Sequence, residues 1–199
     1  MSLTIILTMF SFSLAMSISP GPVNMMIISS GINHGVKKTM AFISGATIGF
    51  TLLLVLIGLG LMNVINLYPS LLEYIEFLGA SFIIYMGYKI ATSLGDITIK
   101  KSEKKVLKFY EGFLLQWLNP KAWIACVSGV SMFVSSSSDF VIFVSIYFVV
   151  CYASLSFWGV LGQKVTRFLN TPKKLKFFNI IMGGVLIISA SSLIIIKMI

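Results

Sequence analysis

Apolar residues fill most of this chain in six long runs, separated by short polar connections. Each run is long enough to cross the ~30 Å hydrocarbon core of a bilayer as a helix. The runs cover residues 3–32, 39–62, 71–93, 112–134, 140–161 and 177–196. This pattern predicts an all-α integral membrane protein with six transmembrane helices.

Two of the six runs contain a break. The first is interrupted by SPGP at 19–22, and the fourth by LNPKA at 118–122. Proline removes a backbone donor and clashes with the preceding helical turn, so neither run can be one straight helix. Broken backbone at membrane depth is tolerated only where protein or a water-filled cavity surrounds it. Helices broken at corresponding places of two halves indicate a transport site.

Composition fits a membrane protein without a soluble domain. Of the 199 residues 57% are hydrophobic and 11% are charged, whereas a soluble domain has about 25% charged residues. The mean hydropathy is +0.99. The net charge of +9 suits the cytoplasmic side of a membrane protein better than nucleic-acid binding. We therefore expect a single transmembrane domain over 1–199, surrounded by lipid and with no nucleic-acid partner.

The positive charges predict an orientation. Lysine and arginine follow the first, third and fifth runs, while connections 63–70 and 135–139 contain neither. By the positive-inside rule, both termini then lie on the outer, periplasmic side. Three spans end on the side opposite to their start, so residues 1–100 and 101–199 are expected to form two inverted three-helix repeats. The broken helices 1 and 4 would face each other at the membrane midplane.

The second break predicts a helix start inside the membrane. Asn119 suits an N-cap, and Pro120 suits the first helical position, where no donor is needed. Lys121 follows in the first turn, far from either predicted surface, and an intramembrane charge is functional by default. It could bind a substrate carboxylate or carry a proton; the alternative is that it snorkels to the cytoplasmic face. Gln116 adds a neutral amide nearby.

The first break predicts a similar start, with Ser19 and Pro20 followed by Pro22. Helix starts leave free N–H groups and a positive dipole end, which bind anions such as carboxylates. Gly21 allows close approach of another group, and Asn24 lies just beyond the break. The carbonyl groups that end the helix before each break suit an ammonium group. Together these groups favour a zwitterion, an α-amino acid.

Other candidate groups are weaker. Glu73 and Glu76 lie one helical turn apart and could carry protons, although solvated surface carboxylates are the favoured interpretation. Cys126 and Cys151 both lie in apolar runs and are expected to be buried free thiols. Metal-binding clusters and phosphate-binding loops are missing from the sequence. We therefore expect no catalytic residues, no metal and no cofactor, and a protein that is not an enzyme.

Two segments carry a resemblance to a known family. The segments SPGPVNMMIISSGINHGVKKTMAFISGATIGF (19–50) and GFLLQWLNPKAW (112–123) resemble the two signatures of the lysine-exporter/homoserine-threonine-resistance family of bacterial amino-acid exporters. The resemblance implies six spans, inverted repeats and amino-acid efflux across the inner membrane against proton influx. One departure is Val23, where many relatives place Asn or Asp. The matching positions here are Pro20, Gly21, Pro22, Asn119, Pro120 and Lys121.

Within this family, the two segments are most similar to the cysteine/O-acetylserine exporter branch. This similarity implies a small neutral substrate, such as cysteine, O-acetylserine, homoserine or threonine. One basic group and no buried acid in the cavity would disfavour a cationic substrate. A membrane thiol–disulfide electron shuttle and a cation exporter of similar fold remain as alternatives. A homo-oligomer is left open.

Overall fold

The computed structural model describes residues 2–61, 67, 69–92, 106–165 and 171–198. Within these residues every regular element is an α-helix, which confirms the all-α class. The eight helices are α1 (Leu3–Ile18), α2 (Pro22–His34), α3 (Val36–Gly58), α5 (Pro69–Ala91), α6 (Phe109–Trp117), α7 (Pro120–Phe133), α8 (Ser137–Val165) and α9 (Pro172–Met198).

Helices and apolar runs coincide closely. Four of the runs correspond to the single helices α3, α5, α8 and α9, and the two proline-containing runs correspond to the pairs α1–α2 and α6–α7. Both expected breaks are therefore confirmed, and α1 and α2 meet at an angle of 61°. By length and composition, α3 and α8 can cross a membrane, and the bent pair α1–α2 makes a third candidate span within the described part of the chain.

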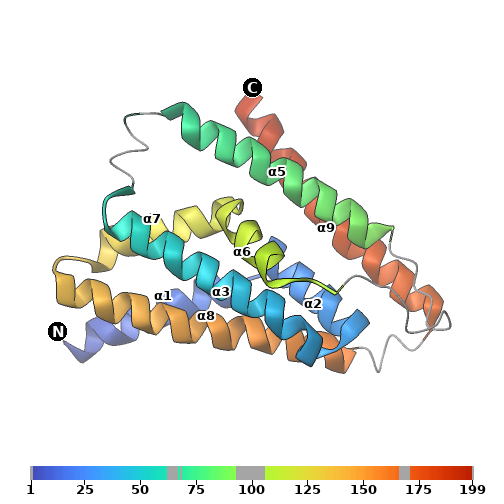
Figure 1. The fold of residues 1–199 in the computed structure, drawn as a ribbon, viewed down its shortest axis with the longest axis horizontal. Helices are drawn as coiled ribbons and strands as arrows, with labels where there is room; N and C mark the ends of the chain where they lie inside the picture. The colour runs from blue at the N-terminus through green and yellow to red at the C-terminus, as the bar shows by residue number, and fades with distance from the viewer. Residues whose placement is uncertain (1, 62–66, 68, 93–105, 166–170, 199) are drawn as a thin grey trace.

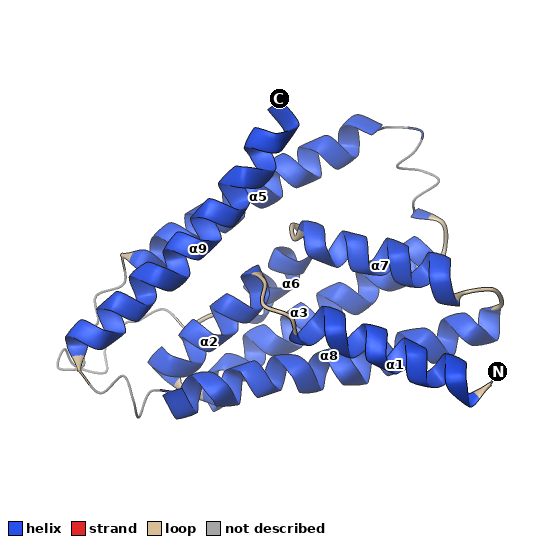
Figure 2. Ribbon diagram, turned by 180° about the vertical axis from the view of Figure 1, so that it is seen from behind, coloured by secondary structure: helices blue, strands red, loops and turns tan. Residues whose placement is uncertain are grey.

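The helices form two groups (Figures 1 and 2). Helices α5 and α9 pack side by side and run antiparallel along one flank. The other six helices form a bundle in which α8 contacts α1, α2 and α3, while α3 also packs on α6 and α7. Both breaks lie inside this bundle, where α1 and α2 contact α7 and α6 respectively.

Glycine allows α3 and α6 to touch through their backbones. A Cβ atom added at Gly45 would collide with the carbonyl oxygen of Phe109, and one added at Gly112 would collide with that of Phe42. Because lipid provides no hydrophobic force between helices, such close contact is a main source of helix association in membranes. The glycines thus let the start of α6 pack directly on the backbone of α3.

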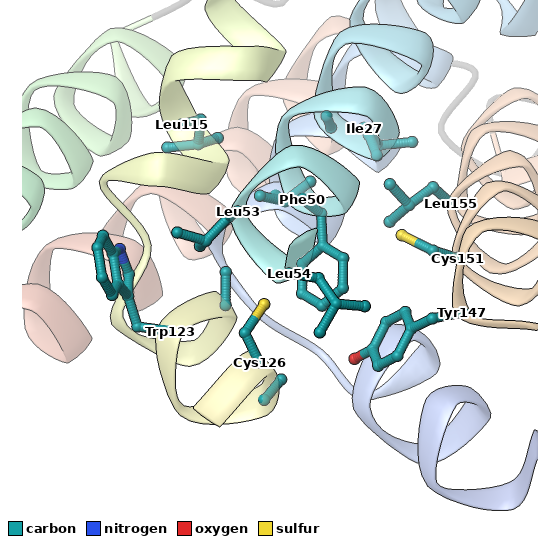
Figure 3. Packing of buried hydrophobic residues seen from close by; sticks show 14 of the residues in the cluster. Ile27, Phe50, Leu53, Leu54, Leu115, Trp123, Cys126, Tyr147, Cys151 and Leu155 are labelled. Atoms are coloured by element: carbon teal, nitrogen blue, oxygen red, sulfur yellow. The ribbon is translucent and has the colours of Figure 1, made fainter. Parts of the chain in front are cut away.

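Aromatic rings fill the bundle beneath the breaks. Phe50 of α3 stacks on Tyr147 of α8 with ring centroids 4.4 Å apart, and Phe143 meets Tyr147 edge to face at 5.7 Å. Figure 3 shows Phe50 and Tyr147 within the larger apolar cluster. Large apolar side chains also cover the outside, with Val149 and Ile188 more than half exposed. An apolar exterior over an apolar core is the expected surface of a protein in lipid.

Candidate functional site

The two helix breaks lie against each other, joined by Lys121. This residue belongs to the first turn of α7, and its side chain reaches the end of α1. There Nζ donates hydrogen bonds of 2.7 Å to both the backbone oxygen and the side-chain oxygen of Ser19. A Cβ atom added at Gly21 would lie 3.3 Å from Cδ of Lys121. Residues 102 positions apart therefore meet, and the missing side chain of Gly21 leaves room for the lysine.

The carbonyl end of α1 is closed by side chains of the protein. Nδ2 of Asn24 donates to the backbone oxygens of Ser17 and Ser19 at 3.0 and 3.1 Å. The indole N–H of Trp158 donates to the backbone oxygen of Ile18 at 3.1 Å. The prediction that these carbonyl groups are free to bind a substrate ammonium is therefore wrong at α1. Buried carbonyls are almost always paired, and here the chain itself supplies the donors.

The carbonyl end of α6 is closed in the same manner. The indole N–H of Trp123 donates to the backbone oxygen of Trp117 at 2.7 Å. Nearby, Nδ2 of Asn119 lies 3.4 Å from Oε1 of Gln116, at the long limit for a hydrogen bond. Each break thus has an indole that pairs with a carbonyl at the end of the preceding helix, and Gln116 keeps an amide oxygen that is only weakly engaged.

Helix α7 begins as the sequence predicts. Asn119 is the N-cap, and its side-chain oxygen accepts a 3.2 Å hydrogen bond from the backbone N–H of Lys121. Pro120 occupies the first helical position. The N–H group of Ala122 is paired with the backbone oxygen of Asn119 at 2.9 Å. This start therefore has few free donors to offer a ligand.

Helix α2 begins differently from the prediction. Ser19 is the C-cap of α1 and not the N-cap of the following helix, so that expectation is wrong. The helix starts at Pro22 with Gly21 as its N-cap, because the residue before a proline is disfavoured in the helical region, and Gly21 is extended. Gly21 has no side chain to accept from the first turn. Among the described residues, no group accepts from the backbone N–H of Val23 or Asn24.

A cavity lies at this junction. In this conformation the cavity has a volume of about 30 Å³, room for roughly two waters. Five predicted residues line it, and Ser19, Pro20, Pro22 and Pro120 shape the breaks behind it. The lining comprises Met16, Ser17, Gly21, Val23, Asn24, Phe50, Gln116, Asn119, Lys121, Ala122, Ala125, Tyr147, Cys151 and Leu155.

Sequence reasoning missed the part of the wall that comes from α8. Tyr147, Cys151 and Leu155 are spaced four residues apart, so they share one helical face and line the cavity together. Figure 3 shows all three projecting from α8 toward the bundle interior. Ser17, one turn before the first break, was missed as well. The four-residue spacing was the available signal for α8, but nothing local distinguishes it from ordinary core packing.

The charge of the cavity comes from a single residue. Lys121 is the only ionisable group among the described lining residues that is charged in its ordinary form at neutral pH. Cys126 and Cys151 are buried and free, as expected. Glu73 and Glu76 belong to α5, and their side chains lie outside the described residues. The chemistry available is therefore binding of an anion by an ammonium and backbone N–H groups, beside amides, hydroxyls and a thiol.

Known proteins similar to this chain are translocators and efflux proteins. Residues 14–197 match the family profile described as LysE type translocator. A leucine efflux protein from an Enterobacter species is 29% identical over 170 residues, 78% of each chain. Cysteine/O-acetylserine efflux proteins from Escherichia coli and Shigella sonnei are each 26% identical over 134 residues, 67% of this chain and 68% of theirs.

No solved structure matches this chain significantly. The family profile nevertheless spans both helix breaks and every helix except the start of α1 and the last residue of α9, so the resemblance seen in the two proline motifs is confirmed along the chain. The protein is a multi-pass membrane protein of a bacterial efflux family. The chain belongs to the LysE type translocators, which are amino-acid efflux transporters and not enzymes.

Proposed function

We propose that this translocator exports small neutral amino acids or their close derivatives across the bacterial inner membrane, in exchange for protons. The observation that carries the proposal is the junction of the two breaks. There the ammonium of Lys121 and the unpaired N–H groups that start α2 lie beside one cavity. Such an arrangement suits the carboxylate that all α-amino acids share.

The proposed carboxylate site has hydrogen-bond donors that the protein itself does not use. An ammonium group has three N–H donors, and Lys121 uses two of them on Ser19. The third can point to a substrate while the first two hold the lysine in place. The backbone N–H groups of Val23 and Asn24, with the positive end of the α2 dipole, supply the remaining contacts. Gly21 keeps this approach open, because any side chain there would meet the lysine.

The substrate ammonium needs acceptors, and the helix carbonyls at α1 are already paired. The cavity offers amide oxygens in their place, from Gln116, Asn119 and Asn24. Prolines 20, 22 and 120 act through the backbone. Because proline has no backbone N–H to donate, these residues prevent the two helices of each broken pair from joining into one continuous helix.

A neutral side chain follows from the charge of the cavity. A lysine or arginine substrate would bring a second cation toward Lys121, and no carboxylate among the described lining residues would balance it. The relatives named above carry the names of leucine, cysteine and O-acetylserine, which have no charged side chain. The same lysine is also the candidate proton carrier, since it is the cation that both breaks share.

Reciprocal packing supports six spans in two inverted repeats, 1–100 and 101–199. The first broken pair, α1–α2, packs on α8, and the second, α6–α7, packs on α3. Helix α3 meets α8, and α5 meets α9. A pseudo-two-fold axis that exchanges spans one and four, two and five, and three and six would reproduce this scheme. With the basic connections in the cytoplasm, both termini are then periplasmic.

The test is counterflow in proteoliposomes. Purified protein is reconstituted with an internal pool of unlabelled amino acid, and uptake of labelled neutral, basic and acidic amino acids is measured with and without a pH gradient. We expect exchange of small neutral amino acids only, with net flux that follows the proton gradient. Exchange of lysine or arginine at a comparable rate would refute the neutral-substrate proposal, and flux indifferent to the gradient would refute proton coupling.

A further inference from the structure

A second polar group of side chains lines the cavity wall formed by α1 and α8. It consists of the Ser17 hydroxyl, the Tyr147 hydroxyl and the Cys151 thiol. All three residues are buried, with Ser17 8% exposed and the other two 2% exposed. None of them belongs to the carboxylate site described above, and the transport of a carboxylate and an ammonium does not require them.

The Ser17 hydroxyl is poorly hydrogen-bonded in this position. Its side-chain oxygen lies beside the phenol of Tyr147 and the thiol of Cys151 but has no hydrogen-bond partner of ordinary geometry. Thr47 of α3 faces the same thiol, and its side-chain oxygen is also unpartnered. Buried hydroxyls without partners are rare because they lose their hydrogen bonds to water. Two such hydroxyls beside one thiol that lines the cavity call for an explanation.

We infer that Ser17, Tyr147 and Cys151 form the subsite for the substrate side chain, and that they select a side chain carrying a hydroxyl or thiol over an aliphatic one of equal size. This inference rests on the proposed function, because it assigns the side-chain end of the same substrate. A hydroxyl or thiol can both donate and accept, so it completes the bonds that the wall leaves open. An aliphatic side chain would bury those groups unpaired.

The apolar part of the same wall limits the size of the side chain. Phe50 stacks firmly on Tyr147, and Leu155 follows Cys151 by one turn on the same helix. Both are almost fully buried. The subsite therefore fits a short substrate side chain with one hydrogen-bonding group near its end. That group would lie near the Ser17 hydroxyl, and aromatic and aliphatic groups of the protein would enclose it.

The test uses isosteric substrate pairs in proteoliposome counterflow. Threonine is compared with valine, and serine with 2-aminobutyrate, because each pair differs by one hydroxyl in place of a methyl group. For wild-type protein we expect the hydroxyl compound to be favoured about tenfold or more in kcat/KM, as one unpaired buried polar group costs about that much binding. Ser17→Ala and Tyr147→Phe should each bring the ratio toward one.

Matched controls separate this subsite from general effects on the fold. Ser13→Ala makes the same change one turn earlier on α1, where the hydroxyl is buried and bonded to the backbone oxygen of Met9 at 2.7 Å. Cys126→Ala is the control for Cys151→Ala, because both cysteines are buried and free but only Cys151 lines the cavity. Both controls should keep the wild-type preference.

The outcomes are distinct. Equal exchange of threonine and valine by wild-type protein, or a preference that survives Ser17→Ala, Tyr147→Phe and Cys151→Ala, overturns the subsite and leaves the proposed function standing. Loss of exchange for every amino acid in the wild type overturns the proposed function and this inference with it. If Ser17→Ala does not give a monodisperse protein, Tyr147→Phe decides, since it removes a single oxygen atom.

Discussion

Replacement of Lys121 by methionine tests the central contact of the structure. Methionine keeps a long unbranched side chain, so most of the volume beside Gly21 stays filled, while the ammonium is lost. The lysine donates two 2.7 Å hydrogen bonds to Ser19, and in the proposed site its third donor meets the substrate carboxylate. We expect Lys121→Met to insert and fold but to transport poorly.

The magnitude follows from the hydrogen bonds. Bonds that involve a charged group contribute about 1.5–3 kcal/mol each, and each 1.4 kcal/mol changes an equilibrium tenfold. Loss of one bond to the carboxylate should therefore weaken substrate binding by about ten- to a hundredfold. The effect on folding should be smaller, because the backbone oxygen of Ser19 keeps its bond from Asn24 at 3.1 Å.

The assay is counterflow of a neutral amino acid over a range of concentrations, with the amount of reconstituted protein measured in the same vesicles. Lys164→Met is the matched control: it removes one positive charge from an exposed position of α8 by the same substitution. Transport by Lys121→Met at the wild-type rate and apparent affinity would show that the lysine does not bind the substrate. A monodisperse variant that binds but does not exchange would instead assign it to the transport step.

Three further predictions concern the fold around the site. Gly21→Ala puts a methyl group 3.3 Å from the lysine side chain, so we expect slower counterflow in a folded protein, whereas Gly184→Ala, with nothing within 4 Å, should transport normally. Asn24→Ala removes two hydrogen bonds at the end of α1 and should lower stability by about 1–3 kcal/mol; an unchanged thermal midpoint in detergent would contradict this. Gly45→Ala forces a Cβ against the carbonyl oxygen of Phe109 and should cost about 1–3 kcal/mol, seen as a midpoint well below that of Gly184→Ala.

The helix breaks and their location could be predicted from the sequence, because proline acts on the chain locally. Pro120 and Asn119 define a helix start from two adjacent residues, and the structure has that start. The helix start at the first break was harder to predict, because Ser19, Pro20 and Pro22 allow the second helix to begin at more than one residue. The helix begins at Pro22, while Ser19 ends α1 and accepts a hydrogen bond from the lysine, a contact with a residue 102 positions away.

The amino-acid sequence by itself determined the class of protein, the runs of helix, the two broken pairs and the presence of one charge deep in the bundle. Those features come from composition and from the local geometry of proline, glycine and capping residues. The tertiary structure decided what the lysine contacts, which helix start stays open and which face of α8 forms the wall. These depend on side chains from α1, α7 and α8 that meet only when the helices pack, and no local pattern encodes which partner a buried polar group will find.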